Sequence, residues 1–183
     1  MDARSILSLI RTQRHDFLNH LQVIQGYLQL NKIPEATEYI RELVLEAGRL
    51  SEINRLCQAE AALALLAARD KAAKQGITVE YGIRTDLRAS ALTGEELGAC
   101  FEDVLAPVID ALSPPRITDR RIKVDLTEEQ GAYLCRIDFD PGNASELKET
   151  VKILHERLSP RQGGAEFTVR AGRGVISLRF PAG

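Results

Sequence analysis

The sequence of 183 residues lacks tryptophan, and aromatic residues make up only 5% of it. Proteins that bind single-stranded nucleic acid stack bases on aromatic side chains, so this composition disfavours that mode of binding. An excess of charge of one sign is lacking as well, because 24 lysines and arginines are balanced by 26 acidic residues and the net charge is -2. Without a basic excess to attract phosphate backbones, we expect no nucleic-acid partner.

Cysteines and long apolar runs are also scarce. Cys57, Cys100 and Cys135 are spaced too widely for a CxxC motif, and their odd number fits reduced thiols in a reducing compartment. The stretch Ile6 to Ile10 is ended by Arg11 and is too short for a signal peptide or a membrane span. We therefore expect a cytoplasmic protein with no metal site and no membrane partner.

Two apolar stripes with helical spacing dominate residues 1–57. Alternating steps of four and three, typical of bundled helices, connect the members of each stripe. The first stripe comprises Ala3, Leu7, Ile10, Arg14, Phe17, Leu21, Ile24 and Leu28, and the second comprises Ala36, Ile40, Leu43, Ala47, Leu50, Ile53 (or Asn54) and Cys57. Between them the segment Asn31 to Pro34 interrupts the pattern, and Pro34 suits the first turn of a new helix. The sequence therefore predicts a long antiparallel helical hairpin.

The two stripes also predict an oligomeric state. Two helices alone leave such stripes partly exposed to water, whereas four helices from two chains can bury them. We therefore expect a homodimer in which residues 1–57 form a four-helix bundle and act as the dimerisation domain. The alternative is that the hairpin packs its stripes on the remainder of its own chain.

Residues 58–183 combine helical and strand patterns. Helices are predicted at 58–75, 94–112 and 145–158. Strands are predicted at 77–81, over 121–139 with a turn near 128–131, and at 165–169 and 175–180. Strands segregated from helices are typical of an α+β fold, here a C-terminal two-layer α/β sandwich.

The run Arg14-His15-Asp16-Phe17-Leu18-Asn19 carries the clearest candidate chemistry. If Phe17 faces the bundle centre, His15 projects from the outer side of its helix, with Asn19 one turn further on. A neutral imidazole nitrogen can attack an activated phosphoryl group and form a phosphoramidate. Asp16 can hold the proton of the other ring nitrogen, and Arg14 can steady phosphate oxygens. Taken alone, a solvated surface histidine remains the ordinary interpretation of this pattern.

The sequence contains two further histidines that are alternative candidates for the reactive residue. His20 lies at the flank of the first stripe near Leu21, and we interpret it as a residue at the edge of the bundle. His155 lies on the 145–158 helix, whose buried face is supplied by Val151, Leu154 and Leu158. We therefore expect His155 to be solvated.

The run RHDFLNHLQVIQGYLQLNKIPEATEYI resembles the phosphoacceptor hairpin of the sporulation initiation phosphotransferase B family. It is also similar to sensor histidine kinases of the citrate and fumarate sensing type. The resemblance implies that His15 is phosphorylated, that Asp16 and Asn19 are its helix neighbours and that Arg14 completes the motif. It further implies a role in a phosphorelay, with sporulation initiation as its setting.

The glycine-containing segments 161–169 and 172–181 resemble the terminal hairpin of a histidine-kinase type (GHKL) ATP-binding domain. An active domain of that type needs an Asn near the position of Pro107 to hold magnesium. The counterpart of its adenine loop, Asp138 to Asn143, keeps an acid and one glycine, and the helix Leu147 to Leu158 has no glycine with which to cradle phosphates. We therefore expect a degenerate domain without ATP chemistry, in which 138–143 is an ordinary turn.

The resulting hypothesis is a phosphotransferase that moves a phosphoryl group from the Asp of one response regulator to His15 and on to the Asp of another. The partner receiver domain is expected to supply Mg²⁺, so the chain needs no cofactor of its own. Arg11, Asn19 and Gln22 share the outer face as docking contacts. Two alternatives remain: a sensor histidine kinase core that still uses ATP, and a non-enzymatic dimeric module that binds response regulators.

Overall fold

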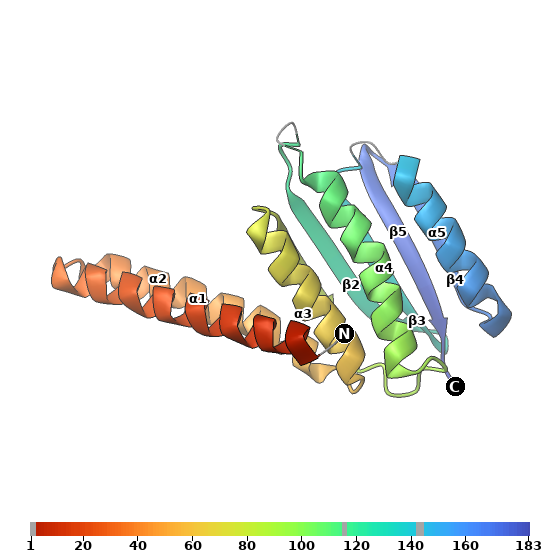
Figure 1. Ribbon diagram of the computed structural model, residues 1–183, viewed down its shortest axis with the longest axis horizontal. Helices are drawn as coiled ribbons and strands as arrows, with labels where there is room; N and C mark the ends of the chain where they lie inside the picture. Colours follow the sequence, from red (N-terminus) through yellow and green to blue (C-terminus); the bar gives the residue numbers. More distant parts are fainter. Residues whose placement is uncertain (1–2, 115–116, 142–144) are drawn as a thin grey trace. The chain divides into compact units, whose positions relative to one another are not determined.

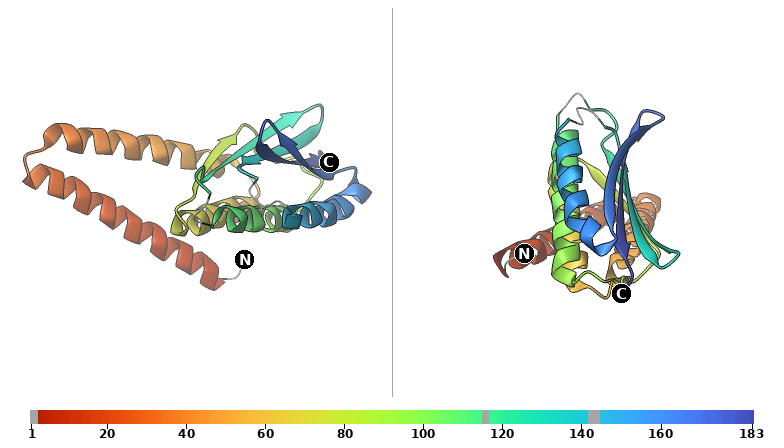
Figure 2. Two further views of the ribbon diagram at one scale, coloured as in Figure 1. Left: turned by 90° about the horizontal axis from the view of Figure 1, so that it is seen from above. Right: turned by 90° about the vertical axis from the view of Figure 1, so that its right-hand side faces the viewer.

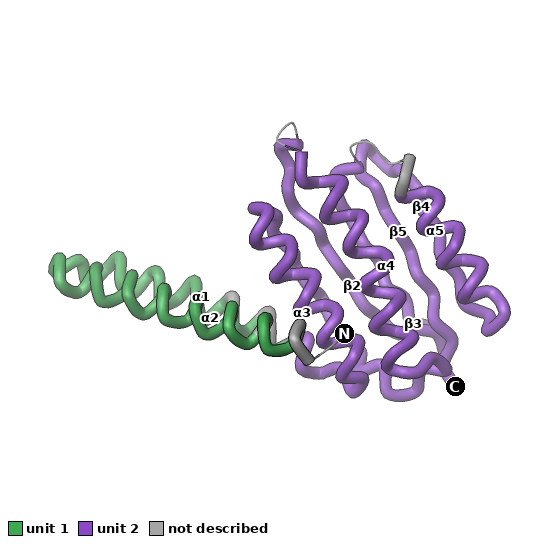
Figure 3. The backbone as a smooth tube through the Cα atoms, viewed as in Figure 1, with its two compact units in different colours: residues 1–51 green, residues 52–183 purple. Residues whose placement is uncertain are grey.

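The computed structural model describes residues 3–114, 117–141 and 145–183 (Figure 1). The chain divides into two compact units, Met1–Ser51 and Glu52–Gly183 (Figure 3). Unit 1 is a helical hairpin, and unit 2 is a sheet covered by helices. The division between Ser51 and Glu52 lies ahead of the boundary near Cys57 that we expect from the sequence.

Unit 1 consists of α1, Ala3–Gln29, and α2, Ile33–Ser51. In the connection, Asn31 takes a left-handed backbone conformation with φ 55°. The N–H of Lys32 donates to the carbonyl of Tyr27 at 2.9 Å, and the N–H of Asn31 donates to that of Leu28 at 3.0 Å. These bonds satisfy carbonyls at the end of α1, as in a Schellman cap. The predicted hairpin is confirmed.

The prediction that the second helix continues to Cys57 is wrong, because α2 ends at Ser51. Ile53 lies in the short 3-10 helix η1, Ile53–Arg55, and is fully buried in unit 2. The N–H of Cys57 donates to the carbonyl of Asp86 at 2.8 Å, also within unit 2. Apolar residues that belong to the core of the next unit happen to continue the spacing of the stripe.

Unit 2 is built on a five-stranded sheet in the order β1-β2-β3-β5-β4. The strands are β1 Thr78–Ile83, β2 Arg121–Glu129, β3 Ala132–Phe139, β4 Gly164–Arg170 and β5 Arg173–Pro181. β1 pairs with β2 in parallel, and the remaining neighbours are antiparallel. Each of the two hairpin turns has two left-handed positions, Gln130 and Gly131 with φ 50° and 73°, and Ala171 and Gly172 with φ 49° and 78°.

The helices α3, Ala59–Lys74, α4, Gly94–Leu112, and α5, Ser145–Leu158, lie side by side on one face of the sheet (Figure 2). A second 3-10 helix, η2, Ser159–Arg161, follows α5. Alternate strand residues are buried beneath this layer, as Ile122, Val124 and Leu126 are on β2. The predicted α+β class and the two-layer sandwich are confirmed.

α3 and α4 lie close together near the start of α4. Thr93 caps this helix, since its hydroxyl accepts from the N–H of Glu96 and its own N–H donates to the Glu96 carboxylate. A Cβ added to Gly98 would lie 3.0 Å from the backbone oxygen of Glu60 on α3. The missing side chain at this position therefore lets α3 and α4 approach each other closely.

Gly98→Val should destabilise unit 2 by about 1–3 kcal/mol, the usual cost of overpacking, because the new side chain meets the backbone of α3. Urea unfolding followed by circular dichroism measures this loss. Glu102→Val, one turn further along α4, is the matched control because Glu102 is exposed. Equal free energies of unfolding for the two variants would contradict the close packing.

Candidate functional site

His15 lies near the middle of α1 and its side chain is in solvent. The side chain is 73% exposed, and that of the neighbouring Asp16 is 58% exposed. Because α1 is a regular helix, residues three and four positions further on, Leu18 and Asn19, share this face. The imidazole is therefore accessible to a second molecule.

Nδ1 of His15 makes the polar contacts of the ring. The amide nitrogen of Asn19 lies 3.1 Å from Nδ1 and can donate to it when the ring proton is on Nε2, and Oδ1 of Asp16 lies 3.5 Å from Nδ1. When Nδ1 carries the proton, it can donate to the Asp16 carboxylate or, with the amide turned, to the Asn19 oxygen. The lone pair then lies on Nε2. With this tautomer, the nucleophilic atom of the neutral imidazole is Nε2.

Arg14 does not join this group. Successive residues of a helix project about 100° apart, so Arg14 points toward the apolar stripe while His15 points away from it. Among the described residues, no hydrogen bond or ion pair connects Arg14 with His15, Asp16 or Asn19. The structure therefore brings three of the four expected site residues together.

Leu18 is a candidate contact residue that the sequence interpretation overlooks. It is 50% exposed and lies three positions from His15 on the same face of α1. The stripe accounts for Phe17 and Leu21 but gives Leu18 no role. An apolar residue just outside the stripe and beside the histidine is the signal that identifies it.

His20 and His155 have different surroundings. Nδ1 of His20 lies 2.8 Å from the hydroxyl of Tyr39 on α2, and the two rings are 5.9 Å apart. His20 thus pairs with the second helix of the hairpin. His155 is exposed, but its Nδ1 lies 3.1 Å from the carbonyl of Ala165 on β4. His155 is thus on the exposed surface of α5, as expected, and it also links α5 to β4.

The counterpart of the kinase nucleotide site lies around the end of β3. α4 runs continuously through Pro107, where a metal-binding Asn is expected. Asp138 belongs to β3 itself. β3 ends at Phe139 and α5 begins at Ser145, so a short connection joins them. Gly142 and Asn143 of the expected adenine loop lie outside the described residues.

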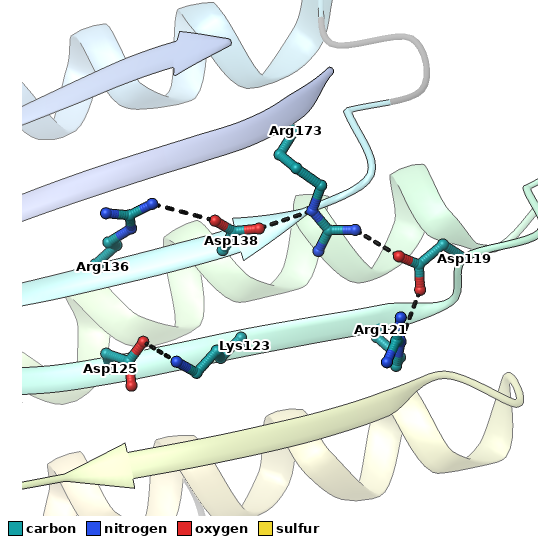
Figure 4. Close-up of polar contacts among 7 residues, drawn as sticks. All are labelled: Asp119, Arg121, Lys123, Asp125, Arg136, Asp138 and Arg173. Atoms are coloured by element: carbon teal, nitrogen blue, oxygen red, sulfur yellow. Dashed lines mark hydrogen bonds and ion pairs between the residues drawn. The ribbon is translucent and has the colours of Figure 1, made fainter. Parts of the chain in front are cut away.

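Asp138 is held by two arginines on the sheet face opposite the helices (Figure 4). Nε of Arg173 donates to it at 2.8 Å, and Nη2 of Arg136 lies 3.3 Å from its second oxygen. Arg173 also bonds Asp119, which accepts from Nε of Arg121 at 2.9 Å. An acid of the expected adenine-loop segment is thus engaged in ion pairs that join β2, β3 and β5.

Comparisons with known proteins place these features in a family. A family model described as the alpha-helical domain of SpoOB-type sensor kinases matches residues 1–56. Sporulation initiation phosphotransferase B of Bacillus subtilis is 30% identical over 149 residues, which cover 79% of this chain and 77% of that protein. The chain belongs to the sporulation initiation phosphotransferase B family. The resemblance seen in the sequence is confirmed.

Further proteins are similar to this family member. Sensor protein CitS of Halalkalibacterium halodurans is 25% identical over 167 residues, and the match spans 88% of this chain but 31% of CitS. Among solved structures, the histidine kinase AdeS of Acinetobacter baumannii has a TM-score of 0.46 at 14% identity, over 92% of this chain and 98% of that one. The histidine kinase domain of a blue-light activated kinase from Erythrobacter litoralis has a TM-score of 0.47 at 11% identity, over 67% and 61%.

Within the described residues, no helix is both long and apolar enough to cross a bilayer. Cys57 is exposed, Cys100 and Cys135 are buried, and all three are free thiols. Burial raises the pKa of the Cys135 thiol to about 12, so this thiol stays protonated at neutral pH.

The ion pairs of Figure 4 predict how the stability of unit 2 depends on pH. Hydrogen bonds from Arg121 and Arg173 lower the pKa of Asp119. A carboxylate whose pKa is lower in the folded state stabilises the fold above its unfolded pKa of about 4, and this contribution is lost as the pH falls through the folded pKa. Asp119→Asn should therefore make the free energy of unfolding depend less steeply on pH below about pH 4.

Urea unfolding at neutral and at acid pH measures this dependence, and Glu102→Gln is the control because it removes an exposed carboxylate of α4. If the free energy of unfolding of Asp119→Asn depends on pH as steeply as that of the wild type and of the control, the ion pairs do not stabilise unit 2.

Proposed function

We propose that this protein is a phosphorelay phosphotransferase in which His15 accepts a phosphoryl group from the aspartyl phosphate of one receiver domain and donates it to an aspartate of another. Family membership supports the class of reaction, and sporulation initiation is the setting that the family name suggests. The observation that carries the proposal is the exposed imidazole whose Nδ1 is held by Asn19 and Asp16. The proposal places the chain in the cytoplasm.

The chemistry requires little of the protein beyond position and charge. The Nε2 lone pair attacks phosphorus, a P–N bond forms, and the P–O bond to the aspartyl carboxylate breaks. The proton stays on Nδ1 of the resulting imidazolium, where the Asp16 carboxylate or the Asn19 oxygen accepts it. In the second transfer an aspartate oxygen attacks phosphorus, the P–N bond breaks, and the neutral imidazole returns. The receiver domain is expected to bring Mg²⁺, which offsets the negative charge of the phosphoryl group.

Arg11, Leu18 and Gln22 surround His15 on the outer face of α1, and all three are exposed. They supply a cation, an apolar contact and an amide to a docking receiver domain. Arg14, which points toward the stripe, is a weaker candidate for contact with phosphate than the sequence motif suggests.

The proposal includes a homodimer formed by the hairpin. Many large apolar side chains of unit 1 are at least 40% exposed, namely Leu7, Ile10, Phe17, Leu18, Leu21, Val23, Leu28, Leu30, Ile33, Ile40, Val44 and Leu45. Exposed apolar surface on this scale marks a protein interface. The charges of the helices are also complementary, because α1 carries three arginines and one aspartate whereas α2 carries four glutamates and two arginines. A second hairpin that sets α1 against α2 satisfies both features.

Leu21→Glu should convert the dimer to a monomer, because a carboxylate in the bundle interior costs several kcal/mol unless it is paired. Sedimentation at micromolar concentration measures the state of each chain. Gln29→Glu, an exposed position on the same helix, adds the same charge and should leave the dimer intact. A wild-type chain that sediments as a monomer would contradict the proposed bundle.

The similarity to CitS favours a second candidate, a sensor histidine kinase core that uses ATP. The short connection between β3 and α5, Pro107 in α4 and the ion pairs of Asp138 support the first candidate instead. The two differ in a direct assay, because a kinase core transfers the γ-phosphate of ATP to His15 without a second protein.

His15→Gln should abolish transfer from a phosphorylated receiver domain while leaving the dimer intact, because the side chain points away from the apolar stripe. The assay follows radiolabel from the receiver to the chain, and the label should be lost in acid and survive in alkali, as expected for a phosphoramidate. Asn19→Ala should retain a reduced rate, since losing one orienting hydrogen bond costs about 1–3 kcal/mol, or about 5-fold to 150-fold.

His20→Gln is the internal control and should retain transfer, because that side chain pairs with Tyr39. Full activity in His15→Gln would refute the mechanism, and loss confined to His20→Gln would move the phosphoryl group to that residue. Label from ATP on His15 in the absence of a receiver would favour the kinase alternative. A wild-type dimer that binds a receiver without acquiring label would favour the non-enzymatic module.

A further inference from the structure

Tyr39 connects the two helices of the hairpin close to the proposed site. Its hydroxyl lies 2.8 Å from Nδ1 of His20, and its ring lies 5.9 Å from the His20 ring and 6.1 Å from that of Tyr27. Among the described residues of unit 1, this is the side-chain hydrogen bond that joins α1 to α2. Because His20 directly follows Asn19, the connection reaches α1 beside the residue that holds His15.

We propose that Tyr39 is a positioning residue for transfer at His15, acting through the hydrogen bond to His20. The inference rests on the proposed function and names a residue outside the phosphoacceptor motif that supports it. Tyr39 belongs to α2 and has no contact with the imidazole of His15, so its effect passes through the backbone of α1.

The physical reason is that apolar contacts alone restrict the rotation and the axial position of a helix only weakly. The attraction between apolar side chains has no preferred direction, in a single hairpin or in a bundle of two hairpins. A hydrogen bond is directional and short, so it restricts both the rotation and the axial position of α1. A shift by a single residue turns a helix by about 100° and moves it about 1.5 Å. Misplacement of a reacting group by about 1 Å can cost about 100-fold in rate.

The bond also predicts which replacements are tolerated. The Tyr39 hydroxyl donates to Nδ1 when His20 carries its proton on Nε2. A glutamine at position 20 has a carbonyl oxygen that can accept from the same hydroxyl, whereas a leucine cannot. His20→Gln should therefore preserve the connection, and His20→Leu should remove it.

The test measures single-turnover transfer from a phosphorylated receiver domain to the full-length chain. Tyr39→Phe removes only the hydroxyl and keeps the ring contacts, so the rate constant should fall about 2-fold to 10-fold, less than for Asn19→Ala, because Tyr39 acts on His15 only through the backbone of α1. The receiver concentration at half-maximal rate should not change, because docking uses the outer face of α1. Tyr27→Phe is the matched control and should behave as the wild type, since the contact of Tyr27 is made by its ring.

A double-mutant cycle completes the experiment. Tyr39→Phe and His20→Leu should lower the rate constant equally, and the combined variant should lose no more than either single one. His20→Gln, which preserves the hydrogen bond, should keep the wild-type rate constant. Wild-type rates in Tyr39→Phe, additive losses in the cycle, or a change only in the half-maximal concentration would each overturn the inference while leaving the role of His15 intact. A wild-type chain that accepts no label would instead refute the proposed function.

Discussion

The constraint on which the hairpin depends is that two helices cannot cover its apolar stripes. Large side chains such as Phe17 and Leu28 remain more than half exposed in the single chain. Burying them requires one particular face of α1 to turn inward, and this choice determines which residues point outward. His15 and Asn19 lie on that outward face, so the packing constraint and the proposed chemistry belong to opposite sides of the same helix. The site therefore needs no cleft of its own.

Much of the fold follows from periodicity and turn residues. The helix at 94–112 and the turns at Gly131 and Gly172 were predictable because two prolines follow the helix in the sequence and a glycine lies in each turn. The end of α2 at Ser51 was not predictable, because Ile53 continues the apolar spacing of the stripe but is buried in the core of unit 2. Spacing alone cannot tell which core an apolar residue joins.

The contacts of the candidate site also fall into those that sequence spacing predicts and those that it does not. Contacts of His15 with Asp16 and Asn19 span one helical turn, so sequence spacing predicts them. The bond between His20 and Tyr39 crosses the hairpin, and the bond between Arg173 and Asp138 crosses the sheet, so both depend on tertiary register. In unit 2 this register places Arg173 on Asp138, an acid of the segment that resembles an adenine loop. That acid thus contributes to ion pairing within the layered fold.

The central claim is that Nδ1 of His15 is held by its helix neighbours and Nε2 reacts. Heteronuclear NMR of a histidine-labelled chain after incubation with a phosphorylated receiver domain tests this claim directly, because nitrogen–phosphorus coupling identifies the bonded atom. The account predicts coupling of phosphorus to Nε2 of His15, with Nδ1 protonated. Coupling to Nδ1, or to a nitrogen of His20 or His155, would contradict it.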